Sequence, residues 1–121
     1  MSVVAAALVA LVALIHAYIL VLEMFLWETP RGRKAFGTTP DQARTMATLA
    51  ANQGLYNGFL AAGLVVGLLL AEPSGFYFQV FFLGCVIVAG IYGGVTVSRR
   101  IIGVQALPAA IALVAVILAA R

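Results

Sequence analysis

The sequence has very few charged residues. Only 9% of its 121 residues are charged, whereas 64% are hydrophobic. Soluble domains are about one quarter charged, so this chain has too few charges to cover a water-facing surface. The shortage excludes a soluble globular protein. It predicts an integral membrane protein with the lipid bilayer as its main partner.

Metal-binding and nucleophilic side chains are equally scarce. One cysteine, Cys85, excludes a disulfide within the chain, and a single histidine, His16, cannot complete a zinc or haem site with it. No glycine-rich nucleotide loop is present. The basic residues lie at the ends of apolar runs, so the net charge of +3 does not suggest nucleic acid. We therefore expect no metal, no cofactor and no nucleic-acid partner.

Long apolar runs predict four membrane-spanning helices, since about 20 apolar residues cross a bilayer. The approximate spans are residues 3–26, 45–71, 76–97 and 101–120. We expect an all-α polytopic bundle of four transmembrane helices, forming one domain over residues 1–121. No Lys or Arg precedes the first run, and it is longer than the ~7–15 apolar residues of a signal peptide. We expect it to be kept as the first helix.

The connections carry turn and helix-start signals. Pro30 and Gly32 are expected to end the first helix. Residues 39–42, Thr-Pro-Asp-Gln, are typical of a capping box with proline at the first helical position, so the second helix is expected to begin at Pro40. Residues 72–75, Glu-Pro-Ser-Gly, predict a tight turn.

Basic residues are strongly biased to one side of this topology. The first and third connections hold every Lys and Arg except Arg121. The positive-inside rule then places these connections in the cytoplasm and both chain ends outside the cell's inner (plasma) membrane.

The polar side chains within the spans predict a pocket that lies within the membrane and faces the cytoplasm. His16 and Glu23 are seven residues apart and therefore about 20° from eclipsed on one helix. A carboxylate at this depth costs ~2.5–3.5 kcal/mol, so we expect the polar face of the second helix to point inward toward Glu23. The predicted ligand-binding residues are His16, Glu23, Trp27, Asn52, Gln53, Tyr56, Asn57, Tyr92 and Gln105.

These signals also have structural interpretations. Glu23 would reach the headgroups and pair with Arg31 or Arg33. His16 would be a neutral core histidine bonded to Asn57 or to a backbone carbonyl. Glycine pairs four residues apart predict close helix packing, either within the bundle or between the two protomers of a homodimer. These pairs are at residues 54 and 58, 63 and 67, and 90 and 94.

Three segments resemble a known family. They read HAYILVLEMFLW at residues 16–27, TPRGRKAFG at residues 29–37 and NQGLYNGFLAAGL at residues 52–64. Together they resemble the DUF 1304 family of small integral membrane proteins. The resemblance implies four transmembrane helices in a bacterial-type inner membrane, and it implies no catalytic residues. The size and the glutamate in the first helix are also similar to small multidrug resistance transporters, whereas the long basic first loop is not.

Three functions stay open on the sequence alone. In the main hypothesis, the pocket binds or transports a small amphipathic or cationic molecule, with Glu23 as its titratable group. In the second, the chain is an enzyme, such as an isomerase, whose Glu23 and His16 exchange protons with a lipid-soluble substrate. In the third, it is a non-catalytic assembly or accessory subunit. The sequence does not decide whether the chain is an enzyme.

Overall fold

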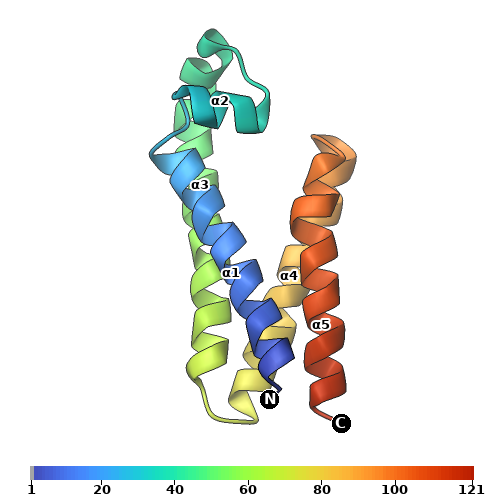
Figure 1. The fold of residues 1–121 in the computed structure, drawn as a ribbon. Helices are drawn as coiled ribbons and strands as arrows, with labels where there is room; N and C mark the ends of the chain where they lie inside the picture. The colour runs from blue at the N-terminus through green and yellow to red at the C-terminus, as the bar shows by residue number, and fades with distance from the viewer. Residues whose placement is uncertain (1) are drawn as a thin grey trace. The chain divides into compact units, whose positions relative to one another are not determined.

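The computed structural model describes residues 2–121, and over that range it contains helices and no strand. The elements are α1 (Val3–Met24), α2 (Pro30–Phe36), α3 (Pro40–Leu69), α4 (Ser74–Thr96), the π-helical stretch η1 (Ile102–Ala106) and α5 (Leu107–Ala119) (Figure 1). The predicted all-α class is confirmed.

Three helical segments are long and apolar enough to cross a membrane. They are Val3–Met24, Ser74–Thr96 and Ile102–Ala119. The longest helix, α3, has 30 residues and is not among them, because it carries several polar residues. The structure therefore supports a helical membrane protein, with three apolar spans in place of the four that the sequence predicts.

The chain divides into two compact units, and both boundaries fall inside helices. One unit is His16–Phe59, which contains the end of α1, all of α2 and the beginning of α3. The other contains α1 up to Ile15 together with Leu60–Arg121. We call them the polar unit and the apolar unit, after the side chains described below.

The apolar unit is built on small and branched aliphatic side chains. Val9, Leu64, Leu83 and Val86 are fully buried in its core. Glycine brings α4 close to the next segment, since a Cβ on Gly90 would lie 2.6 Å from a backbone nitrogen of η1. The glycines at residues 90 and 94 thus serve packing within the chain.

The π-helical stretch precedes a proline. Pro108 has no N–H and its ring would clash with the carbonyl four residues earlier, so a regular α-helix is disfavoured there. The N–H of Leu107 instead donates to the carbonyl of Ile102, which widens the turn. The helix continues past Pro108 as α5.

In the polar unit, α1 and α3 also approach closely at glycine. A Cβ on Gly54 would lie 2.7 Å from Cγ of Met24 and 3.0 Å from Cβ of Glu23. A Cβ on Gly58 would meet the side chain of Leu20 in the same way. This glycine pair lets the two helix backbones come near enough for short polar side chains to bridge them.

The first connection differs from the sequence prediction. Pro30 and Gly32 do not simply end the first helix, because α1 ends at Met24 and Pro30 begins α2. Proline is well suited to the first helical turn, where its missing N–H has no partner to lose. The hydroxyl of Thr29 caps α2 by accepting from the N–H of Gly32 at 3.2 Å, and Gly37 ends it with a positive φ of 68°.

The predicted start of α3 is confirmed. The N–H of Thr39 donates to Oε1 of Gln42 at 2.9 Å, and the N–H of Gln42 donates to Oγ1 of Thr39 at 3.1 Å. This reciprocal pair is a capping box, and α3 begins at Pro40. The predicted turn at residues 72–75 lies only partly between two helices, since α3 ends at Leu69 and α4 already begins at Ser74.

Candidate functional site

A hydrogen bond between α1 and α3 holds the one buried carboxylate among the residues that the structure describes. Glu23 lies in the last turn of α1 and is 4% exposed. Its Oε1 accepts from Nδ2 of Asn57 at 2.7 Å. Asn57 also donates to the backbone carbonyl of Gln53, at 3.2 Å. The amide is therefore held in place by its own helix while it binds the carboxylate.

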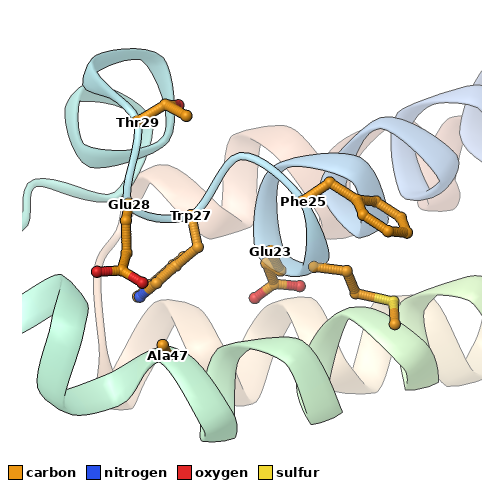
Figure 2. Close-up of a pocket in the computed structure, with 7 residues that line it drawn as sticks. Glu23, Phe25, Trp27, Glu28, Thr29 and Ala47 are labelled. Carbon is orange, nitrogen blue, oxygen red and sulfur yellow. The ribbon is translucent and has the colours of Figure 1, made fainter.

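Glu23 lies beside a cavity of about 300 Å³. The cavity is bounded by the last turn of α1, by the residues that follow it and by one residue of α3. Its lining residues are Glu23, Met24, Phe25, Trp27, Glu28, Thr29 and Ala47. In Figure 2 the side chain of Glu23 extends from the end of α1, and those of Trp27 and Glu28 extend from the turn after it, toward the helix that carries Ala47.

Trp27 is fixed at the cavity by a buried hydrogen bond. Its indole Nε1 donates to the backbone carbonyl of Ala43 at 2.8 Å. Its ring also packs on Phe36 of α2, with ring centroids 4.9 Å apart. The short helix α2 thus supports the indole, which forms an aromatic wall of the cavity.

The cavity lining carries two carboxylates, Glu23 and Glu28, and no basic side chain. The nearby guanidinium groups bond elsewhere: Nη1 of Arg31 donates to the hydroxyl of Tyr18 at 3.1 Å, and Nε of Arg33 donates to the backbone carbonyl of Glu28 at 3.3 Å. The hydrogen bond to Tyr18 raises the pKa of Arg31, so this guanidinium stays charged.

The structure does not form the pairing of Glu23 with Arg31 or Arg33 that one interpretation of the sequence expects. Within residues 2–121, the one ion pair joins Arg44 to Asp41 at the start of α3. No group of three or more His, Cys, Asp or Glu side chains in that range is arranged to hold a metal ion. Two carboxylates beside an indole and a thioether are instead suited to an organic cation.

A comparison with protein families now places the chain. The model of the family described as "Protein of unknown function (DUF1304)" matches residues 10–117. The chain belongs to this family. It is also similar to a protein named "Uncharacterized protein YpaA" from Lactococcus lactis subsp. lactis (strain IL1403), with 29% identity over 106 residues that cover 86% of this chain and 88% of that protein. No solved structure matches the chain.

The segments that carry the DUF1304 resemblance build most of the polar unit. Residues 16–27 supply Glu23 and Trp27, residues 29–37 form α2 with its cap, and residues 52–64 supply Asn57 and the glycines that face α1. The family resemblance and the candidate site therefore coincide in the sequence.

Seven of the nine predicted site residues belong to the polar unit. Glu23 and Trp27 line the cavity, and Asn57 binds Glu23. His16 is fully buried. The side chains of Asn52, Gln53 and Tyr56 are exposed, so only part of the polar face of α3 points inward. The contact with α1 is narrow and is occupied by Gly54, Gly58 and Asn57.

The other two predicted residues belong to the apolar unit. Tyr92 is 71% exposed, and Gln105 is half-buried in the π-helical stretch. The prediction that all nine residues line one pocket stays a prediction.

Five lining residues are not among the predicted site residues: Met24, Phe25, Glu28, Thr29 and Ala47. The sequence analysis treated residues 27–44 as a loop and gave Glu28 no role. Two signals could have found it. The chain has only four acidic residues, and two of them, Glu23 and Glu28, flank its single tryptophan. Such clustering is informative in a chain with so little charge.

Proposed function

We propose that this protein is a membrane protein that binds a small amphipathic cation in the cavity beside Glu23. The observation that carries the proposal is the lining itself: a buried carboxylate, a second carboxylate and a fixed indole, with no basic side chain. Glu23 is the proposed counter-ion, Trp27 the aromatic surface, and Asn57 the residue that orients the carboxylate.

The physical argument starts from the cost of burial. Removing a carboxylate from water is unfavourable unless an opposite charge or hydrogen bonds compensate for the lost hydration. The single hydrogen bond from the Asn57 side chain compensates Glu23 only in part. A cation in the cavity would supply the missing charge. An indole face adds roughly 0.5–2 kcal/mol for a cation placed over it. The cavity of about 300 Å³ is at the small end of the range of ligand pockets, which favours a compact cation.

We further propose that α3 is a fourth membrane span. A helix of 30 residues is roughly 45 Å long, which exceeds the ~30 Å hydrocarbon thickness. Asn57, one of the residues that lower its mean hydropathy, binds Glu23 within the chain. With four spans, the basic first and third connections lie in the cytoplasm and both chain ends lie outside. Transport of the bound cation and a homodimer are extensions of this proposal that need their own tests.

The single tryptophan provides a direct test, because Trp27 lines the proposed site. Benzyltrimethylammonium is titrated into the purified protein in lipid nanodiscs while tryptophan fluorescence is recorded. Neopentylbenzene, which has the same shape without the charge, is the ligand control. We expect a saturable fluorescence change with the cation only. In Glu23→Gln the affinity should fall by about tenfold or more, because two opposite charges about 4 Å apart attract each other by roughly 1–4 kcal/mol, depending on how much water screens them.

The matched control variant is Asp41→Asn, which removes an exposed carboxylate that lies outside the cavity. It should bind the cation like the wild type. Equal affinity in wild type and Glu23→Gln, or an equal response to neopentylbenzene, would refute the proposal. If the cation has no effect and Glu23→Gln only lowers thermal stability, the carboxylate serves packing and the assembly-subunit hypothesis replaces this one.

A further inference from the structure

A second cavity lies in the apolar unit and shares no residue with the first. Its volume is about 290 Å³. It is bounded by the turn between α3 and α4, the beginning of α4 and the end of α5. Its lining residues are Glu72, Phe76, Gln79, Val116, Ala119 and Ala120.

Gln79 gives this cavity an unusual polar feature. The side chain is fully buried, and its Nε2 donates to the backbone carbonyl of Gly67 at 2.9 Å. A carbonyl can only accept, so this bond fixes which end of the amide carries the nitrogen. Oε1 of Gln79 is buried and has no hydrogen-bond partner. A buried acceptor that has no hydrogen-bond partner favours a ligand that carries a hydrogen-bond donor.

Glu72 supplies the second polar group of the lining. Its Oε2 accepts from the backbone N–H of Phe76 at 3.2 Å, and the carboxylate takes part in no ion pair within residues 2–121. The lining includes no Lys, Arg or His. Both polar groups are therefore acceptors, and one of them is negatively charged. The complementary ligand carries several donors and a positive charge.

We propose that this cavity binds the ammonium group of a primary amine whose compact apolar body packs against Phe76, Val116 and Ala119. A primary ammonium has three donors and no acceptor, so it can serve Gln79 and Glu72 together. A quaternary ammonium has the charge without the donors. The amine can come from the ethanolamine headgroup of a lipid or from a free molecule. This proposal is independent of the function proposed for the Glu23 site.

The buried amide itself reports binding. The protein is labelled with ¹⁵N in its glutamine side chains and placed in phosphatidylcholine nanodiscs, and the Gln79 resonances are identified from their loss in Gln79→Met. Hexylamine is titrated against two control ligands, hexanol and hexyltrimethylammonium. We expect a saturable shift of the Gln79 side-chain resonances with hexylamine alone. An equal shift with either control ligand, or no shift with hexylamine, overturns the proposal.

Variants of the other lining residues test the site without removing its reporter. Glu72→Gln keeps the shape of an exposed side chain, and we expect about fivefold weaker binding, as for the loss of an exposed ion pair. Ala119→Leu fills the cavity and should abolish the saturable shift. Asp41→Asn is the control and should bind like the wild type. If Ala119→Leu does not fold, Glu72→Gln decides, and unchanged affinity in that variant contradicts the proposal.

Membrane composition distinguishes the two sources of the amine. In nanodiscs containing phosphatidylethanolamine, a Gln79 resonance that already lies at the shifted position, and that hexylamine no longer moves, identifies the lipid headgroup. A resonance that phosphatidylethanolamine leaves unchanged and hexylamine still shifts identifies a free amine. Both outcomes support an ammonium site. The absence of any shift with either source refutes it.

Discussion

The two compact units differ in what holds their helices together. In the polar unit, His16–Phe59, specific hydrogen bonds join the helices: Asn57 donates to Glu23, and Trp27 donates to Ala43. Glycines in α3 also allow α1 to pack closely against it. The core of the apolar unit is made of Ala, Val and Leu side chains. The starts of α2 and α3 have side-chain caps, whereas those of η1 and α5 have none.

This difference has a physical meaning in a membrane. Lipid tails are as apolar as leucine, so apolar helices gain stability mainly from close packing and not from leaving the solvent. Packing depends on shape and tolerates many apolar sequences of similar volume. Hydrogen bonds require particular side chains at particular positions. The polar unit is therefore where the sequence is most restricted, and it also holds two carboxylates beside a fixed indole.

The largest expected effect on stability is in the apolar core. Leu64 is fully buried, and Leu64→Ala leaves a cavity that should lower the free energy of unfolding by about 2–5 kcal/mol. The affinity for benzyltrimethylammonium at Trp27 should not change, because Leu64 is outside the Glu23 cavity. Reversible unfolding in mixed micelles, followed by circular dichroism, measures the first effect, and tryptophan fluorescence measures the second.

Leu69→Ala is the matched control for this change. It makes the same substitution on the same helix, at a side chain that is 80% exposed, and it should alter stability by no more than about 0.5 kcal/mol. If Leu64→Ala weakened cation binding as much as Glu23→Gln does, the contrast between a packing unit and a binding unit would be wrong.

The sequence was most informative where polar residues interrupt an apolar run. The capping box at residues 39–42 predicted the first residue of α3, and the carboxylate in α1 was expected to meet the polar face of α3. Asn57 does meet Glu23. The capping box is local and depends little on the rest of the fold, whereas the contact between Asn57 and Glu23 depends on how α1 and α3 pack together.

Other features could not be predicted from the sequence alone. Asn52 is as polar as Asn57, but only the residues along the narrow glycine contact reach α1. Helix periodicity gives a broad face and not the line of closest approach. The short helix α2 could not be predicted either. Pro30 can end one helix or begin another, and which of the two it does depends on where α1 ends.

Gly32→Ala tests whether the turn that carries Trp27 and Glu28 depends on close backbone contact. A Cβ at this position would clash with the backbone carbonyl oxygen of Leu26. We expect a loss of about 1–3 kcal/mol, since backbone is displaced less easily than a flexible side chain. We also expect weaker cation binding, because the added Cβ would also lie 2.9 Å from the backbone oxygen of Trp27, which lines the cavity.

The control is Gly84→Ala in α4, where an added Cβ would meet nothing within 4 Å. Alanine favours a helix by roughly 0.5–1 kcal/mol over glycine, so this variant should be as stable as the wild type or slightly more stable. Unfolding in mixed micelles and the fluorescence titration apply to both variants. If both glycines tolerate alanine equally, α2 does not pack closely against the end of α1.

The smallest expected effect concerns the cap of α3. Thr39→Ala removes the hydroxyl that accepts from the N–H of Gln42, which should cost about 0.5–2 kcal/mol. Thr48→Ala, at an exposed position inside the same helix, removes no cap and should change stability by less than about 0.5 kcal/mol. Amide hydrogen exchange of residues 41–43 should quicken in the first variant only. Unchanged exchange at residues 41–43 in Thr39→Ala would mean that tertiary contacts, such as the hydrogen bond from Trp27 to Ala43, fix the helix start without the capping box.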